Sequence, residues 1–115
     1  MLDDITATTL QVALSGLAER QRVTADNIAN IETPGFRAGR VMFEDALRSA
    51  VAGGAPGQAR PTLARSMEPT RTDGNNVNLD HETLSNVDTN LRYQLLLRAL
   101  DSKFGLLHDV IKGGG

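Results

Sequence analysis

Residues 24–38 read TADNIANIETPGFRA, and this stretch decides where the first helix of the chain ends. Proline restricts the residue before it, Thr33, to extended conformations, and Pro34-Gly35 suits the two central positions of a type II turn. Asn30, just ahead of the turn, is a candidate for the left-handed residue that terminates many helices. We therefore expect a helix to stop here and a tight turn to follow.

Before the turn, apolar residues recur at alternating spacings of four and three, the pattern of a helix that packs along its length. Gln21 and Thr24 are polar members of this seam, and a buried polar residue there costs stability while it fixes register. The sequence therefore predicts an N-terminal helix over residues 1–31. Its seam consists of Leu10, Leu14, Leu17, Gln21, Thr24, Ile28 and Ile31.

Residues 32–79, which begin with this turn, form a middle segment rich in Gly, Pro and Arg. Phe43, Leu47 and Val51 recur every four residues, which fits a short amphipathic helix. The stretch from Gly53 to Gly74 carries few large apolar side chains, so their burial cannot offset the entropy of ordering it. We interpret this stretch as a linker, as a strand pair completed through assembly, or as both.

A turn signal, DGNN at residues 73–76, precedes a second predicted helix over residues 80–115. Asp80 offers a side-chain acceptor to the first turn, and Glu82 places negative charge at the positive end of the helix dipole. The apolar stripe along this helix consists of Leu84, Val87, Leu91 and Leu95, continued on a slightly rotated face by Leu97, Leu100, Phe104, Leu107 and Ile111.

The second helix is too long for a small globule. A helix of roughly 30 residues is about 45 Å long, whereas a compact chain of this size has a diameter of about 35 Å. Two such helices can lie against each other, but each then leaves apolar positions in water. We therefore expect a mainly α chain whose core is completed by neighbouring copies or relatives and whose free monomer is largely disordered.

Composition argues against several classes of function. The 115 residues suffice for one domain, and a net charge of −2 offers no basic face for nucleic acid. Cysteine is absent, and no apolar run is long enough to span a membrane. The acidic start at residues 1–4 is unlike a secretory leader, so we expect none.

Catalytic and metal chemistry are also not expected. His81 and His108 have no second histidine one helical turn away, and residues 53–57 lack the Lys-Ser end of a phosphate-binding loop. No nucleophile stands with a partnered base. We therefore predict no enzyme, no cofactor and no metal site.

The stretch at residues 24–38 resembles the signature of the bacterial flagellar rod and hook family, in which an Asn-Ile-Ala-Asn helix end meets a Thr-Pro-Gly-aromatic turn. Residues 43–47, 73–80 and 112–114 further resemble the proximal rod subunits of that family. The matching signature residues are Asn27, Ile28, Ala29, Asn30, Thr33, Pro34, Gly35 and Phe36.

The resemblance implies a structural subunit at the base of the axial drive shaft, in the periplasm. Such proteins are exported unfolded by the flagellar type III apparatus. Their terminal helices pair as an antiparallel coiled-coil inner layer around which an extended or partly β, loop-rich middle lies. The implied partners are copies of the chain, FlgC-like rod subunits, a FliE-like rod-base protein and the export gate.

The family also suggests that a Phe-x-x-x-hydrophobic motif docks on the export switch protein, and Phe43 and Leu47 match it. Their spacing is one helical turn, so both side chains could enter one groove. A small helical adaptor or export chaperone that binds a partner helix is the alternative class. Such a protein should be folded and dimeric in solution, whereas a rod subunit should be poorly structured when dilute.

Overall fold

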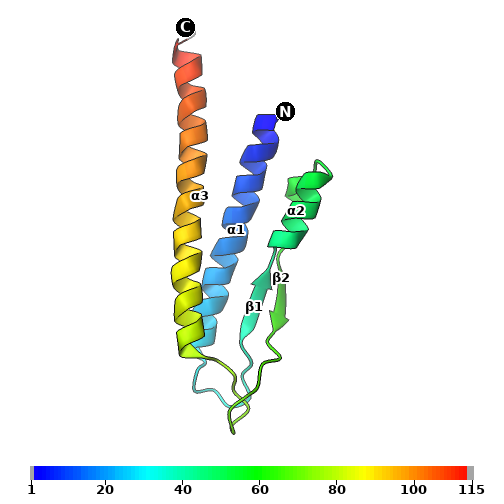
Figure 1. The fold of residues 1–115 in the computed structure, drawn as a ribbon, viewed down its shortest axis with the longest axis vertical. Helices are drawn as coiled ribbons and strands as arrows, with labels where there is room; N and C mark the ends of the chain where they lie inside the picture. The colour runs from blue at the N-terminus through cyan, green and yellow to red at the C-terminus, as the bar shows by residue number, and fades with distance from the viewer. Residues whose placement is uncertain (1, 114–115) are drawn as a thin grey trace.

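In the computed structural model, the backbone is described for residues 2–113 and the side chains for residues 4–103. Two long helices lie side by side and run in opposite directions, and a short hairpin and a small helix pack on the other side of the first (Figure 1). The elements are α1 (Leu2–Ala29), β1 (Gly39–Met42), α2 (Glu44–Ala52), the 3-10 helix η1 (Pro56–Gln58), β2 (Thr62–Arg65) and α3 (Leu79–Gly113).

The fold class predicted from the sequence is confirmed: the chain is mainly helical, its long terminal helices pack together, and a small β-containing middle joins them. The molecule is also elongated, with extents of 67, 26 and 14 Å along its principal axes. It is therefore closer to a rod than to a globule.

The turn after α1 has the predicted type II geometry. The Phe36 N–H donates to the Thr33 carbonyl at 3.2 Å, and Gly35, the second central residue, has φ of +75°. The expectation for Asn30 is wrong, because no described residue other than glycine has a positive φ. Asn30 instead donates its side-chain amide to the Asp26 carbonyl at 2.9 Å, so it caps the helix end while staying right-handed.

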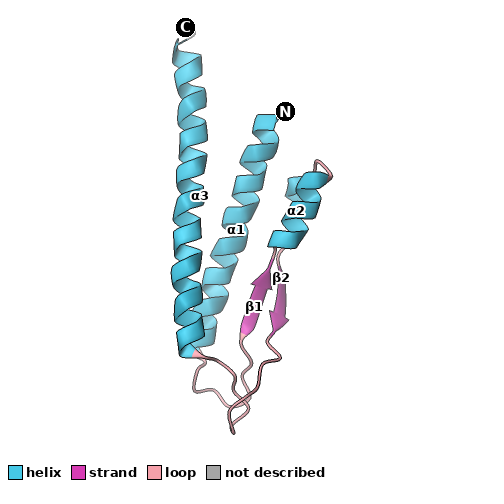
Figure 2. Ribbon diagram, in the orientation of Figure 1, coloured by secondary structure: helices cyan, strands magenta, loops and turns pink. Residues whose placement is uncertain are grey.

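Residues 39–42 and 62–65 form a two-stranded antiparallel hairpin (Figure 2). Gly39 lies opposite Arg65, and Met42 lies opposite Thr62. The stretch interpreted as a linker or a strand completed through assembly thus finds its strand partner within its own chain. Three of the four β2 side chains are exposed, so this strand depends on backbone pairing rather than on burial.

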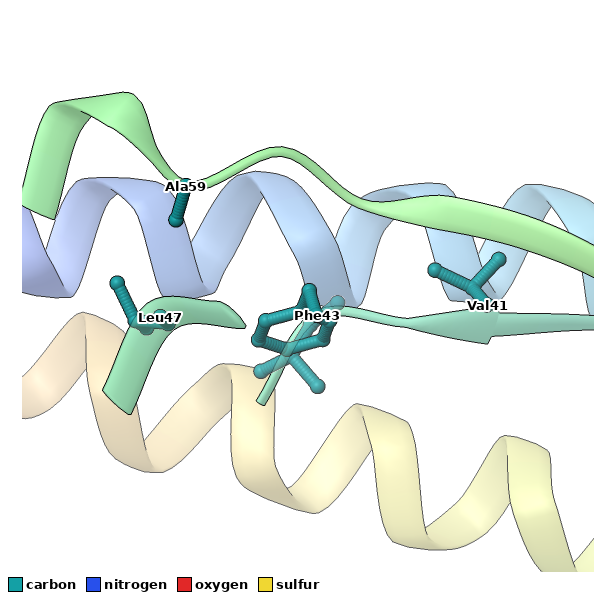
Figure 3. Packing of buried hydrophobic residues seen from close by; sticks show 5 residues of the cluster. Val41, Phe43, Leu47 and Ala59 are labelled. Atoms are coloured by element: carbon teal, nitrogen blue, oxygen red, sulfur yellow. The ribbon is translucent and has the colours of Figure 1, made fainter. Parts of the chain in front are cut away.

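The predicted amphipathic helix is α2, which buries Leu47. Phe43 directly precedes it and lies in the middle of the small apolar core (Figure 3). Tyr93 and Leu96 of α3 pack against this core, so the hairpin and α2 are joined to both long helices. The buried apolar cluster consists of Leu17, Val41, Phe43, Leu47 and Ala59.

The helix α3 begins at Leu79, earlier than expected. Its first turn is capped by Asn78, whose Oδ1 accepts the His81 N–H at 3.1 Å, and not by Asp80. Asn78 takes this role because its carbonyl already accepts the Glu82 N–H at 2.9 Å. Within the described residues, no helix has the length and apolar character needed to cross a bilayer.

Candidate functional site

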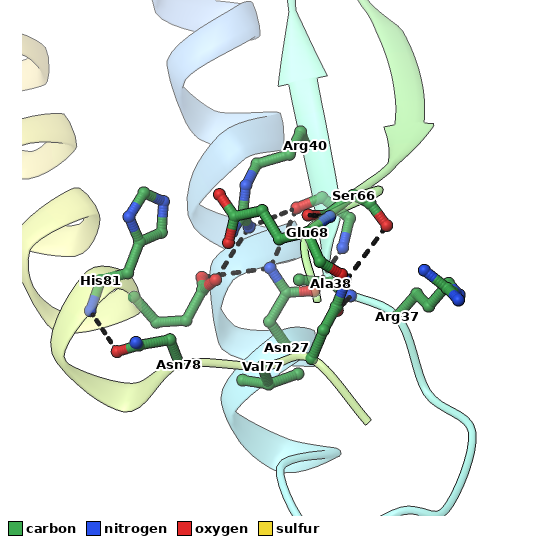
Figure 4. A network of polar contacts seen from close by, with 12 residues as sticks. Asn27, Arg37, Ala38, Arg40, Ser66, Glu68, Val77, Asn78 and His81 are labelled. Carbon is green, nitrogen blue, oxygen red and sulfur yellow. Dashed lines mark hydrogen bonds and ion pairs between the residues drawn. The ribbon is translucent and has the colours of Figure 1, made fainter. Parts of the chain in front are cut away.

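The signature residue Asn27 joins three separate elements near the end of α1 (Figure 4). Its side chain is 1% exposed. Oδ1 accepts the Gly39 N–H at 2.8 Å, and Nδ2 donates to the Gly39 carbonyl at 3.0 Å and to Glu82 Oε2 at 3.1 Å. The amide thereby makes both bonds to Gly39 that a neighbouring strand would make, and it ties β1 to α1 and α3.

Glu82 is the most deeply buried charged side chain among the described residues, at 1% exposure. Its second oxygen, Oε1, accepts from Arg40 Nη1 at 2.8 Å, so Asn27 and Arg40 divide the carboxylate between them. The other Arg40 terminal nitrogen, Nη2, is buried without a hydrogen-bond partner. Removing Arg40 would leave the buried Glu82 carboxylate without its counter-charge, which is costly.

Asn76 closes the base of the hairpin. Its Oδ1 accepts the Ala38 N–H at 2.7 Å, and its Nδ2 donates to the carbonyls of Ser66 and Glu68, each at 3.1 Å. The side chain therefore satisfies backbone groups on the extensions of both strands, next to the last bond between them, in which the Ser66 N–H donates to the Ala38 carbonyl at 2.8 Å. Because it is only 6% exposed, water cannot readily replace these bonds.

Asn75 closes the signature turn. It is fully buried, and its Nδ2 donates to the carbonyls of Asn30 at 2.9 Å and Thr33 at 2.8 Å. The Gly35 N–H donates to the Asp73 carbonyl at 2.8 Å, so the two turns are held face to face. Polar contacts therefore hold the signature turn and the DGNN run together. We call Asn27, Arg40, Asn75, Asn76 and Glu82 together the polar junction.

The junction positions backbone and carries no arrangement for catalysis. Its amides and its single ion pair are all occupied with groups of the chain itself, apart from Arg40 Nη2. Among the described residues, no group of three His, Cys, Asp or Glu side chains could hold a metal ion. What the junction can do is fix how α1, the hairpin and α3 are placed relative to one another.

The remaining signature residues lie around the junction. Ile28 is half-buried, and Ala29, Pro34 and Gly35 are exposed. Phe36 is half-buried beneath Arg65, whose guanidinium carbon lies 5.5 Å from the ring centre. The sequence reasoning missed Asn75, Asn76 and Arg40 as parts of the site. The paired asparagines after a turn were the signal available.

The predicted assembly seam is divided by the structure. On α1, Leu17 is buried and Leu10 and Leu14 are half-buried. On α3, the first part of the stripe faces away from α1, because Glu82 and Thr89 occupy the contact face at 1% exposure. The exposed members of this part are Leu84 at 71%, Val87 at 60%, Leu91 at 58% and Leu95 at 57%, and Leu97, on the rotated face, is 38% exposed.

Leu100 is half-buried, and the side chains of Phe104, Leu107 and Ile111 lie outside the described residues. We call Leu84, Val87, Leu91 and Leu95 the outer stripe. The expectation that these leucines pack between chains rather than within one remains a prediction.

Beside the outer stripe, an apolar groove of about 530 Å³ lies between α1, α2 and α3. Ala13 and Leu17 form one wall, Phe43 and Leu47 another, and Leu96 a third. Leu95 belongs both to the groove and to the outer stripe, so the two make one continuous apolar surface.

The two residues of the suggested export motif lie inside the folded chain. Phe43 is 5% exposed and Leu47 is 9% exposed. Phe43 also lies under Arg20, whose guanidinium carbon is 5.0 Å from the ring centre. Only a small part of each side chain is accessible in the folded chain, where both line the apolar groove.

The sequence of the helix end and turn matches a family model. The model described as "Flagella basal body rod protein" covers residues 8–37, which is most of α1 and the signature turn. The match includes Asn27, one of the five junction residues.

Relatives match along nearly the whole chain. The flagellar basal body rod protein FlgB of Salmonella typhimurium is 31% identical over 125 residues, covering 90% of this chain and 91% of that protein. FlgB of Escherichia coli is 32% identical over 125 residues with the same coverage. FlgB of Bacillus subtilis is 31% identical over 121 residues, covering 91% of this chain and 92% of that protein. The chain therefore belongs to the FlgB family of flagellar basal body rod proteins.

Membership gives the coarse function and location. The chain is a structural component of the bacterial flagellum, it acts in motility as part of the basal body rod, and it assembles there with other rod components. The adaptor or chaperone class considered from the sequence is thereby set aside in favour of a rod subunit.

Proposed function

We propose that this chain is a proximal subunit of the rod, placed at the base of the axial drive shaft in the periplasm and assembled by helix packing between subunits. The observation that carries the proposal is the exposure of the outer stripe, 57–71% for four consecutive stripe residues of α3. A soluble monomer rarely leaves so continuous an apolar row in water, and such rows mark protein–protein contacts.

Helix packing between subunits would gain hydrophobic free energy from the outer stripe. Burial of a fully exposed Leu or Val side chain is worth about 1.5–3 kcal/mol, so four side chains that are 57–71% exposed supply about 4–7 kcal/mol per subunit before the costs of association. The small core within the chain cannot use these residues, since Glu82 and Thr89 fill the face of α3 that meets α1. Neighbouring subunits can bury these stripe residues.

The partners in this proposal are FlgC-like rod subunits, a FliE-like rod-base protein and further copies of the chain. All would pack against the long helices in an inner layer built from residues 1–31 and 80–115. The hairpin and α2, within residues 32–79, would lie outside that layer, because they pack on α1 away from the exposed face of α3.

The proposal includes export through the flagellar type III apparatus before folding. Burial of Phe43 and Leu47 supports this order of events, since the pair can dock on the export switch protein only in the unfolded chain. Folding would then bury the docking motif. The small core is compatible with a chain that stays unfolded until it is delivered.

The test is the composition of the rod in cells that lack this chain. Deletion should abolish motility and leave basal bodies without an assembled rod, and expression of the intact chain should restore both. Immunogold labelling of isolated basal bodies should place an epitope-tagged chain at the proximal end of the rod. Motile deletion cells, or label confined to the cytoplasm, would contradict the proposal.

A further inference from the structure

We propose that the free edge of β2 receives an extended, acidic segment of another basal body protein, which adds a third strand to the hairpin. The contact lies on the hairpin and not on the long helices, so it goes beyond the proposed function. Three observations support it: the uncovered backbone groups of β2, a hollow beside this strand, and a set of exposed arginines without ion pairs.

The register of the hairpin determines which backbone groups point outward. In an antiparallel pair, successive residues direct their backbone groups alternately toward the partner strand and away from it. The Ser66 N–H donates to the Ala38 carbonyl at 2.8 Å, so these two residues face each other as a hydrogen-bonded pair. Residues 39 and 41 of β1 and residues 63 and 65 of β2 therefore direct their backbone groups outward.

The outward edge of β1 is already occupied by side chains of α1. Asn27 binds both the N–H and the carbonyl of Gly39. Arg20 Nη2 donates to the Val41 carbonyl at 2.6 Å. Side chains of α1 thus take the place of a neighbouring strand along β1.

The outward edge of β2 has no such cover. Among the described residues, no side chain or loop bonds to the outward N–H and carbonyl groups of Leu63 and Arg65. β2 lies on the side of β1 away from α1, at the margin of the molecule (Figure 2). An added strand would satisfy all of these groups at once, which is how extended peptides bind to exposed sheet edges.

A hollow beside Leu63 offers a place for one side chain of the added strand. It is about 80 Å³ in volume and is bounded by Glu19, Val41 and Pro61 among others. Leu63 lies opposite Val41 in the register, so its side chain lies on the face of the hairpin that meets the apolar core. The partner segment therefore needs a small apolar residue next to Leu63.

The charge around β2 favours an acidic partner. Arg37, Arg60 and Arg65 are exposed, and none of them forms an ion pair with a described residue. Glu68 is the one acidic residue between positions 53 and 71. Since strands rise about 3.3 Å per residue, Arg60 and Arg65 are about 17 Å apart along the chain, and an extended segment of about six residues spans both.

A second copy of β2 fits this edge less well. It would bring a second set of unpaired arginines against the first, and like charges on neighbouring strands are destabilising. An acidic segment neutralises these arginines instead. We therefore assign the edge to a different protein.

The test places a photoreactive group beside the edge. Thr62, which is exposed, is replaced by a benzophenone-bearing amino acid in the full-length chain, expressed in cells that lack the unaltered chain. After irradiation, basal bodies are isolated and the cross-linked peptides are sequenced by mass spectrometry. We expect a cross-link to an acidic segment of a different basal body protein.

Two substitutions at position 63, each combined with the photoreactive group, test whether the partner is bound as a strand. Leu63→Pro removes an outward N–H and puts ring carbons where the added strand would lie, whereas residues 62 and 64 keep their bonds to β1. Leu63→Thr keeps the N–H and suits a strand. The cross-link yield should fall by at least about tenfold in the proline variant and by less than about threefold in the threonine variant.

A second pair of variants tests the charge. Arg60→Glu should lower the yield by about fivefold, because it replaces attraction to the acidic segment with repulsion. Arg48→Glu makes the same change of charge on α2, where Arg48 is paired with Asp45 at 3.1 Å, and should change the yield by less than about twofold. Both arginines are exposed, so neither substitution disturbs the core.

Several results would overturn the inference and leave the proposed function standing. They are a cross-link only to copies of this chain, a cross-linked segment without acidic residues, equal yields from Leu63→Pro and Leu63→Thr, and no cross-link although the chain is present in the basal body. If the Leu63→Pro chain does not enter the basal body, the comparison of Arg60→Glu with Arg48→Glu decides, and equal yields from these two variants overturn the inference.

Discussion

The ring of Phe43 lies directly on the backbone of Gly16, in the middle of α1. A Cβ atom placed on Gly16 would come within 2.5 Å of Phe43 Cδ1 and 2.6 Å of Cγ, closer than real contacts allow. Glycine inside a helix is otherwise unfavourable by about 1 kcal/mol relative to alanine. The close approach explains why the helix carries one here: it brings the hairpin and α2 against α1.

Gly16→Ala should therefore destabilise the chain although alanine is the better helix former. Overpacking costs about 1–3 kcal/mol, more than the propensity gain if the ring cannot move aside. Thermal unfolding should show a lower Tm. Gly53→Ala, at the end of α2 with no atom closer than 3.6 Å to the new Cβ, is the matched control and should change Tm little. Equal Tm values for both variants would contradict the role of the contact.

Asn27→Ala should loosen the polar junction. The substitution leaves the Gly39 N–H and one oxygen of Glu82 without partners, whereas the Gly39 carbonyl keeps its bond from Arg40 Nη1 at 3.0 Å. Each unsatisfied buried group costs about 1–3 kcal/mol. Helicity should fall at a protein concentration where the unaltered chain is folded. Asn86→Ala, at an exposed position of α3, serves as the comparison and should keep full helicity. A folded Asn27→Ala chain with unchanged stability would contradict the role of Asn27 in holding the junction together.

Leu91→Asp should block assembly without unfolding the subunit. The side chain is 58% exposed, so the charge stays in water in the free chain and stability should change by about 0.5 kcal/mol or less. In a packed seam the same charge would be buried without a partner, which is costly. Motility should be lost, whereas Asn86→Asp should leave cells motile. A motile Leu91→Asp strain would remove the outer stripe from the assembly interface.

Phe43→Ala should lower secretion of the chain if residues 43 and 47 dock on the export apparatus. Since Phe43 is also a core residue, the control must lose core packing without touching the motif. Leu17→Ala meets this need, because Leu17 is 3% exposed in the same cluster. Immunoblots of culture supernatant should show less of the Phe43→Ala chain and undiminished Leu17→Ala. Equal losses from both variants would attribute the effect to folding.

The dilute chain should be only marginally folded. Among residues 4–103, five apolar residues make up the buried cluster, and three of the most deeply buried large side chains are Glu82, Asn27 and Asn75, whose burial adds little net stability. Circular dichroism should therefore show helicity that rises with protein concentration. Strong helicity that is independent of concentration would argue against dependence on neighbouring subunits.

The long helices and the signature turn could be predicted because local patterns specify them. Leu10, Leu14 and Leu17 mark a period that only a helix satisfies, and Pro34-Gly35 permits few turn types. The amphipathic segment at Phe43 and Leu47 was visible for the same reason. Its burial against Gly16 was not, since a lone glycine in a helical pattern does not reveal what approaches it.

The junction could not be predicted because its partners are distant in sequence. Asn27 and Glu82 are separated by 55 positions, and Asn76 and Ala38 by 38. Glu82 was interpreted through its local effect on the helix dipole, whereas its burial beside Arg40 depends on tertiary structure. The Asp80 cap failed for a smaller reason: Asn78 lies two residues earlier and can serve equally well.

These long sequence separations also determine when the hydrogen bonds of the junction can form. If the chain is exported unfolded and N-terminus first, as proposed above, Asn27 emerges early, but its side-chain amide can make all its bonds only after Gly39 and then Glu82 have emerged. Contacts between such distant positions are rewarded only after the intervening loop has closed. Such a chain would stay unfolded during export and would form the junction only when its last third, which contains Glu82, has emerged. Folding would then be delayed until the chain reaches its site of assembly.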